Sequence, residues 1–119
     1  MNLHLVFQTI SFVVVVVLFS LSLLHAEGSD LSGLKEGKAL YHQYCGECHG
    51  LQKDGTGSLG PLLEQGPANL NSHMTQSKSD EELFIIIKQG GGVEMHGWAD
   101  TLRDDEIRSL VGYIRHSNP

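Results

Sequence analysis

The feature that most constrains the fold is a pentapeptide, Cys45-Gly46-Glu47-Cys48-His49, which holds both cysteines of the chain. Its pattern, C-x-x-C-H, is the attachment sequence of a c-type haem. Two thiols three positions apart can add to the two vinyl groups of one haem, and the histidine that follows can supply an axial ligand to the iron. We therefore expect the rest of the chain to fold around a large, flat, apolar cofactor.

Three other uses of the pentapeptide compete with haem attachment. A thioredoxin-type redox pair would lie in a βαβ context, and no such pattern surrounds Cys45. A zinc site would need two further ligands, and the spacing of His73 and His96 does not suggest zinc. A simple disulfide would not need His49. The sequence therefore favours Cys45 and Cys48 as the attachment residues and His49 as an iron ligand.

Residues 1–26 contain no Asp, Glu, Lys or Arg, and Ile10–Leu24 is an apolar run broken only by serines. Ala26 offers a small residue at a cleavage point, as in a secretory signal peptide. The leading region has no Lys or Arg, and Leu24 is larger than the usual residue at its position. Uncut, Val6–Leu24 is just long enough to span a bilayer. We expect residues 1–26 to be a signal peptide or an N-terminal membrane anchor, and either places the domain of residues 27–119 on the export side, in the periplasm.

Residues 27–119 carry all the formal charge of the chain, 8 basic and 14 acidic side chains, for a net charge of −6. An acidic surface argues against nucleic acid and anionic lipid headgroups as partners. We expect the protein to contact a membrane only through residues 1–26, if they are retained. It favours redox partners with a basic or neutral docking surface. A domain of this length has a thin core of its own. We expect a monomer whose fold depends on its cofactor.

Three main helices are predicted, at Leu34–Tyr44, Asp80–Lys88 and Asp104–Arg115. Ser79 and Glu82 form a capping box before the second helix, and three glycines from Gly90 end it. A polar lead, 27–32, precedes the first helix, and Gly50–Pro67 is a loop punctuated by glycine and proline. The fold class is therefore all-α.

A haem held by His49 either has a second axial ligand from the protein or leaves that coordination position open. The candidates among methionines are Met74 and Met95. Met95 lies between two predicted helices and follows three glycines, which let the backbone approach a haem plane. We predict Met95 as the ligand, because a thioether opposite an imidazole stabilises ferrous iron. His96 is the nearest rival and His73 a distant one.

At this point the chain resembles the small monohaem class I cytochromes c of bacterial type, over residues 33–115. The residues that carry the likeness are Gly37 and Tyr41, Gly60-Pro61, Leu83-Phe84, Met95 and Trp98, and Leu110 and Tyr113. The resemblance implies three helices and Gly/Pro-rich loops wrapped around one covalent haem c. It implies that the first and last helices cross at Gly37, and that the carbonyl of Pro61 accepts the proton on the other ring nitrogen of His49.

Two positions depart from the family pattern. The relatives commonly have Met-Pro where this chain has Met95-His96, so the ligand loop is less constrained and His96 is a potential substitute. Arg103 stands where a capping Ser or Thr is usual. Trp98 is expected either to hydrogen-bond a haem propionate through its indole N–H or simply to pack against the haem.

The predicted function is one-electron transfer by a haem with His49 and Met95 as ligands, between redox proteins on the export side. No acid–base pair, nucleophile or open metal position identifies a catalytic residue, so no enzymatic activity is expected. One alternative is a haem subunit held permanently in a respiratory or dehydrogenase complex. Another is a sensor or peroxidase that binds a ligand at a labile distal position.

Overall fold

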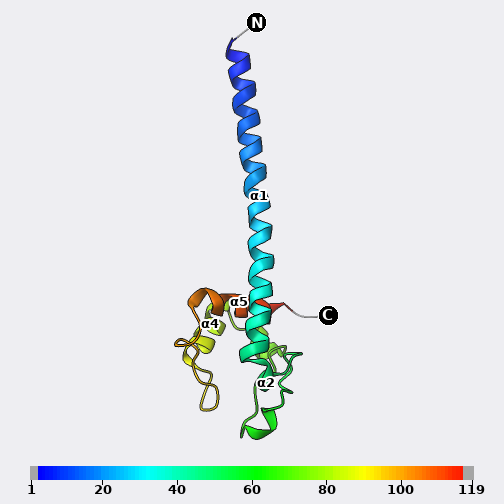
Figure 1. Ribbon diagram of the computed structural model, residues 1–119, viewed down its shortest axis with the longest axis vertical. Helices are drawn as coiled ribbons and strands as arrows, with labels where there is room; N and C mark the ends of the chain where they lie inside the picture. Colours follow the sequence, from blue (N-terminus) through cyan, green and yellow to red (C-terminus); the bar gives the residue numbers. More distant parts are fainter. Residues whose placement is uncertain (1–2, 117–119) are drawn as a thin grey trace. The chain divides into compact units, whose positions relative to one another are not determined.

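The structure is a computed structural model that describes residues 3–116, with the backbone alone for residues 3–6 and 21–30. The chain divides into two compact units at residues 32 and 33, and each is considered by itself. The second unit contains the C-x-x-C-H motif and every element that follows it (Figure 1).

The first helix, α1, extends over Leu3–Tyr44. The predicted helix at Leu34–Tyr44 is therefore present, but its predicted start and the polar lead at 27–32 were wrong. Glycine alone costs a helix only about 1 kcal/mol relative to alanine, and no proline occurs before Pro61 to break the hydrogen-bond ladder. The prediction of a signal peptide or anchor at residues 1–26 falls partly outside the described residues and stays a prediction.

In the first unit, the apolar side chains described between Phe7 and Phe19 are exposed. Among the described residues, no helix combines the length and the apolar character needed to cross a membrane.

Helices α4 (Asp80–Gln89) and α5 (Asp104–Arg115) lie where the sequence predicts them, within one residue. The capping box before α4 is confirmed, because Ser79 Oγ accepts from the Glu82 N–H and the Glu82 carboxylate accepts from the Ser79 N–H. At α5 the Arg103 N–H donates to Glu106 at 2.8 Å, so this helix has the reciprocal half of a box despite lacking a capping hydroxyl.

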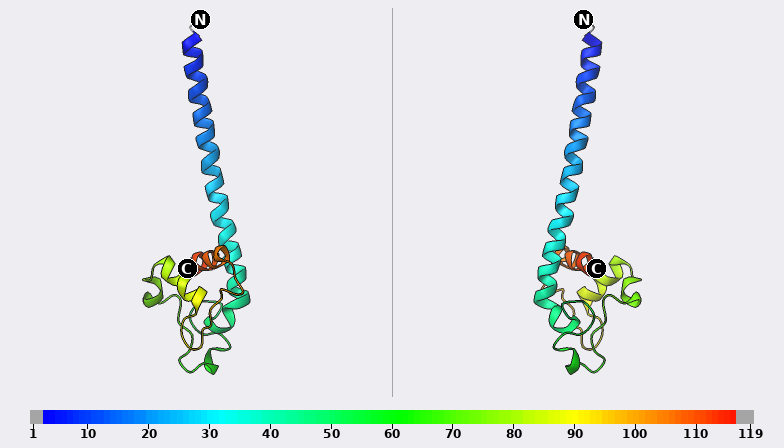
Figure 2. Two further views of the ribbon diagram at one scale, coloured as in Figure 1. Left: turned by 90° about the vertical axis from the view of Figure 1, so that its left-hand side faces the viewer. Right: turned by 90° about the vertical axis from the view of Figure 1, so that its right-hand side faces the viewer.

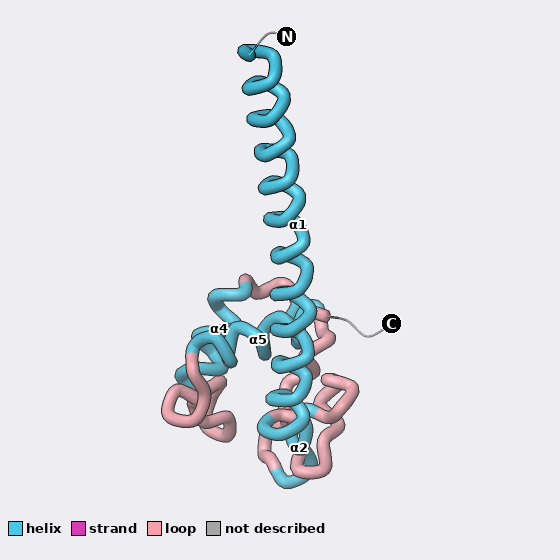
Figure 3. The backbone as a smooth tube through the Cα atoms, turned by 45° about the horizontal axis from the view of Figure 1, so that its top comes forward, coloured by secondary structure: helices cyan, strands magenta, loops and turns pink. Residues whose placement is uncertain are grey.

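Three short elements complete the second unit: α2 (Gly46–His49), the 3₁₀ turn η1 (Gly60–Leu62) and α3 (His73–Gln76). The described residues contain no β-strand, only an isolated bridge between Gly90 and His96 (Figure 3). The all-α fold class is therefore confirmed. Loops make up most of the chain between α2 and α4.

The core of the second unit is built mainly by α4 and α5. Its buried members are Tyr41, Leu83, Phe84, Ile87, Leu102, Ile107, Leu110, Val111, Tyr113 and Ile114. The last turns of α1 cross α5 at Gly37, where an added β-carbon would lie 2.6 Å from the Ser109 carbonyl carbon (Figure 2). This confirms the predicted crossing and explains why a glycine interrupts the buried face of a helix.

Candidate haem-binding site

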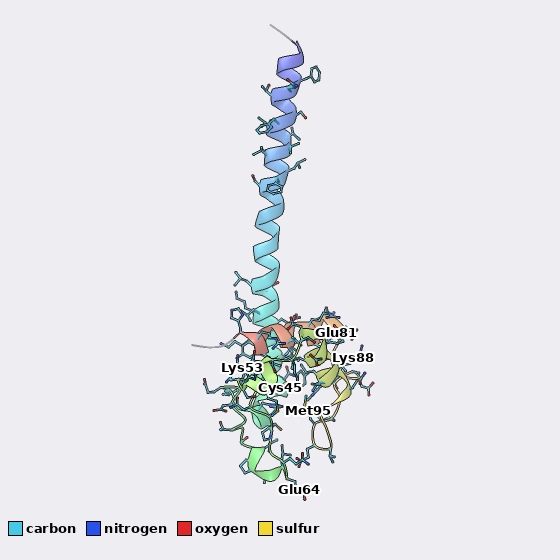
Figure 4. All side chains as sticks on the ribbon, turned by 180° about the vertical axis from the view of Figure 1, so that it is seen from behind. Cys45, Lys53, Glu64, Glu81, Lys88 and Met95 are labelled. Carbon is cyan, nitrogen blue, oxygen red and sulfur yellow. The ribbon has the colours of Figure 1, made fainter. Side chains whose placement is uncertain are left out.

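A pocket of about 520 Å³ lies in the second unit and brings together five of the predicted site residues, namely Cys45, Cys48, His49, Met95 and Trp98. Its walls come from the end of α1, from α2, from the loop after η1 and from the loop between α4 and α5. The pocket-lining residues Cys45, Glu64 and Met95 are labelled in Figure 4. Apolar side chains at Leu59, Leu63 and Val93 complete a lining suited to a largely apolar ligand.

The C-x-x-C-H segment is held in place through its backbone. Tyr41, fully buried, donates its hydroxyl to the Gly50 carbonyl at 2.7 Å. The glycine-rich loop then returns across the motif, where the Gly57 N–H donates to the Cys48 carbonyl at 3.2 Å. A β-carbon at Gly57 would lie 2.5 Å from that carbonyl oxygen. The absence of a side chain at Gly57 therefore allows this loop to pack closely against the backbone of the motif.

Both cysteines line the pocket, and no disulfide joins them. Burial, and then the neighbouring Cys48, raise the pKa of the Cys45 thiol to about 12. A thioredoxin-type pair needs a thiol with a lowered pKa, so the environment of Cys45 argues against that use. Among the residues that the structure describes, no group of three or more His, Cys, Asp or Glu side chains is arranged to hold a metal ion.

The orientation of the His49 ring is fixed by Ala68, whose carbonyl oxygen lies 2.9 Å from Nδ1. A carbonyl can only accept, so Nδ1 carries the proton and Nε2 keeps a lone pair for a metal. The prediction that Pro61 supplies this carbonyl was therefore wrong. Pro61 is exposed in η1, whereas a turn at Gly66, with φ of 67°, leads the chain through Pro67 to Ala68 beside the histidine.

Met95 lies in the loop between α4 and α5, and the preceding glycines fold that loop back on itself. The Gly91 N–H donates to the Met95 carbonyl at 3.0 Å. A β-carbon at Gly91 would lie 2.8 Å from Met95 Sδ, so the glycine leaves room for the thioether. These glycines thus shape the methionine loop, which also presents Met95 to the pocket.

The other candidate ligands differ in position. Met74 and His73 lie in α3, both exposed, and neither lines the pocket. His96 does line it, with its ring 4.4 Å from that of Trp98, and Trp98 also packs on Tyr44 at 5.3 Å. Trp98 is therefore part of an aromatic cluster at the pocket wall.

Sequence reasoning missed Lys53, a buried lysine that follows the haem motif. Its ammonium donates to the carbonyls of Tyr113, at 3.2 Å, and His116, and lies 4.6 Å from the centre of the Tyr113 ring. Burial lowers the pKa of Lys53, while the helix-end carbonyls favour its charged form. The backbone φ of Lys53 is 63°. This conformation cannot be recognised from the sequence, so it could not have indicated that Lys53 is buried.

The donor set fits a haem. The His49 imidazole leaves Nε2 available, the Met95 thioether belongs to the lining of the same pocket, and two thiols precede the imidazole in the chain. Imidazole with thioether is the axial pair of cytochromes c. The pocket is also within the size range that buries a cofactor-sized ligand.

Comparison with known proteins identifies the family of the chain. Residues 32–114 match the family described as cytochrome c oxidase, cbb3-type, subunit III. A dihydro-haem d1 dehydrogenase of Pseudomonas aeruginosa is 31% identical over 88 residues, covering 74% of this chain and 16% of that protein. The cbb3-type oxidase subunit CcoP of Azospirillum brasilense is 28% identical over 94 residues, covering 78% of this chain and 31% of that subunit. The chain thus spans less than a third of the curated relatives it matches. It belongs to the cytochrome c family described as subunit III of cbb3-type cytochrome c oxidase, for which the cofactor is a covalently bound haem c.

Proposed function

We propose that this protein is a one-electron carrier whose haem is attached through Cys45 and Cys48 and ligated by His49 and Met95. The single observation that carries the proposal is the lining of one pocket by both candidate axial side chains together with both thiols. With both axial positions filled, no position is left for a substrate, so the proposal assigns electron transfer and no bond-making step.

The haem supplies a ferrous/ferric couple when it is bound. The chain's own residues set how that couple behaves. Ala68 fixes the His49 ring and strengthens Nε2 as a donor by accepting the proton on Nδ1. The Met95 thioether favours the ferrous state and so raises the potential. The rings of Trp98 and Tyr44 pack on each other at the pocket wall, and the Trp98 indole N–H is proposed to donate to a haem propionate.

The surface around the pocket suits brief encounters with redox proteins. Leu59 and Val93 are exposed at the pocket, and the carboxylates that line it are Glu47, Glu64 and Glu94. No Lys or Arg is among its described lining residues. We propose that the protein, as a monomer, docks on basic or neutral surfaces by this acidic rim, with charge setting the encounter rate more than the affinity.

Covalent attachment of a c-type haem is proposed to take place on the export side, with residues 1–26 as the targeting segment. Intact mass and N-terminal sequencing of the protein from its native host test this. A chain that begins at Glu27 indicates a cleaved signal peptide, and a full-length chain in the membrane fraction indicates a retained anchor. A full-length chain recovered from the cytoplasm would contradict export.

An optical spectrum with and without CO tests the ligand assignment. The ferric protein is expected to show a sulfur-to-iron charge-transfer band, and the ferrous protein to bind CO slowly. Met95→Ala should abolish the band and open the site, because the thioether is gone. Met74→Ala is the matched control and should change neither, since Met74 is 77% exposed and lies outside the pocket.

Two outcomes would contradict the carrier. A wild-type protein that binds CO at once would favour the sensor or peroxidase alternative. A band that survives Met95→Ala would remove Met95 as the ligand. His96→Ala separates the remaining cases, because a bis-histidine spectrum in the wild type that is lost in this variant would identify His96 instead.

A second candidate function is a haem subunit fixed in a respiratory complex. It is favoured by the description of the family and by the relative named as an oxidase subunit. Native electrophoresis of mildly solubilised membranes with haem staining distinguishes the two. A carrier migrates alone near its own mass of 13.0 kDa or less, whereas a fixed subunit migrates with a large complex.

A further inference from the structure

Glu94 joins two walls of the pocket that are far apart in the sequence. Its carboxylate accepts the backbone N–H of Glu64 at 2.7 Å through Oε1 and that of Gln65 at 3.2 Å through Oε2. Glu94 precedes Met95, and Glu64 and Gln65 lie in the loop that leads to Ala68 (Figure 4 labels Glu64 and Met95). One side chain therefore connects the methionine loop to the loop that orients His49.

Few other interactions fix these walls to each other. Among the described residues, no other hydrogen bond or ion pair joins 59–68 to 90–98. Gly66 and Gly92, which flank the contact, have φ values of 67° and 135°, and a β-carbon at either would meet nothing within 4 Å. The two loops are thus open where they meet, and the hydrogen bonds described between them are those of the Glu94 carboxylate.

We propose that Glu94 is a positioning residue that clasps the two walls together and keeps the Met95 thioether on the iron. This inference rests on the proposed function. Without the clasp, the hydrogen bonds described for the methionine loop lie at its base, from the Gly91 N–H to Met95 and from the Trp98 and Ala99 N–H groups to the end of α4. A larger fraction of molecules then has Met95 displaced, and a competing ligand binds in proportion to that fraction.

The charge of Glu94 and its contacts can be separated by substitution. Glu94→Ala removes both hydrogen bonds. Glu94→Gln removes the same charge but keeps one acceptor oxygen, so it should retain part of the clasp. Glu64→Gln is the matched control, because it removes a charge at the same pocket rim while the backbone N–H of residue 64 remains to donate.

Three measurements on the holo-protein test the proposal: CO association with the ferrous form, the strength of the sulfur-to-iron band, and amide hydrogen exchange at residues 64 and 65. For Glu94→Ala we expect CO association to rise about tenfold, since two charge-assisted hydrogen bonds at an exposed site are lost. The band should weaken and the two amides should exchange faster. Glu94→Gln should fall between this variant and the wild type, and Glu64→Gln should match the wild type.

The proposal is overturned if Glu94→Ala binds CO at the wild-type rate, whether or not the amides exchange faster. It is also overturned if Glu64→Gln and Glu94→Ala behave alike, because charge alone would then explain the effect. Failure of the proposed function has a different signature. In that case the wild type itself lacks the sulfur-to-iron band, or Met95→Ala leaves the band intact. Both results are obtained without the Glu94 variants.

Discussion

The crossing of α1 and α5 at Gly37 gives a sharp prediction for stability. An added β-carbon would lie 2.6 Å from the Ser109 carbonyl carbon and closer still to its oxygen, and 3.0 Å from Tyr113 Cβ. Carbon atoms in ordinary contact are about 3.5–4.0 Å apart, so the two helices would have to separate by roughly 1 Å or more. Both obstructing groups at Ser109 are backbone and cannot rotate away.

We therefore expect Gly37→Ala to lower the free energy of unfolding by about 2–3 kcal/mol, the upper part of the usual range for overpacking. Gly37→Val should cost at least as much. For a domain of this size the loss corresponds to a fall in melting temperature of about 10–20 °C. Thermal unfolding of the holo-protein, followed by far-UV circular dichroism, measures it.

Gly112→Ala is the matched control, because it lies in α5 and a β-carbon there would meet nothing within 4 Å. It should stabilise the protein by about 0.5–1 kcal/mol through helix propensity alone. Equal melting temperatures for Gly37→Ala and the wild type would mean that the two helices do not meet at Gly37.

Two further predictions concern Lys53 and Glu82. Lys53→Met should destabilise the protein by about 1–3 kcal/mol, because the carbonyls of Tyr113 and His116 lose a buried donor. Thermal unfolding measures this loss. The control is Lys38→Met, at an exposed site, which should leave the melting temperature unchanged. The Ser79 N–H, followed by the Ser79 hydroxyl, lowers the pKa of Glu82, so its contribution to stability is present above the unfolded-state pKa and is lost as pH falls through the lower, folded-state pKa. Glu82→Gln should therefore flatten the acid side of the plot of melting temperature against pH, and an unchanged acid side would contradict the role of the capping box.

The helices that sequence reasoning placed well are those whose local signals agree. In α5, apolar residues at helical spacing coincide with acidic residues in the first turn, and the predicted bounds match the structure. In α4 the capping box and the glycines fix both ends. The start of α1 was misplaced because a glycine-containing polar stretch was read as a break, whereas only proline would have forced one.

The parts of the site that were missed depend on the path of loops. The chain has two Gly-Pro pairs, and the second, Gly66-Pro67, leads to the carbonyl that holds His49. A choice between them depends on which loop returns to the histidine, which neither dipeptide encodes. A lysine in a loop is normally taken as exposed, and the burial of Lys53 depends on α5 carbonyls about sixty residues away.

In the proposed carrier, His49 and Met95 cap the iron on both sides, so the iron only exchanges an electron. A potentiometric titration of the holo-protein, followed optically under nitrogen and then under CO, distinguishes a capped iron from an open one. We expect one wave with a one-electron slope of about 59 mV per tenfold change in the ratio of oxidised to reduced protein, at the same midpoint under both gases. A midpoint that rises under CO would show a ferrous iron open to ligands, and would contradict a carrier ligated by His49 and Met95.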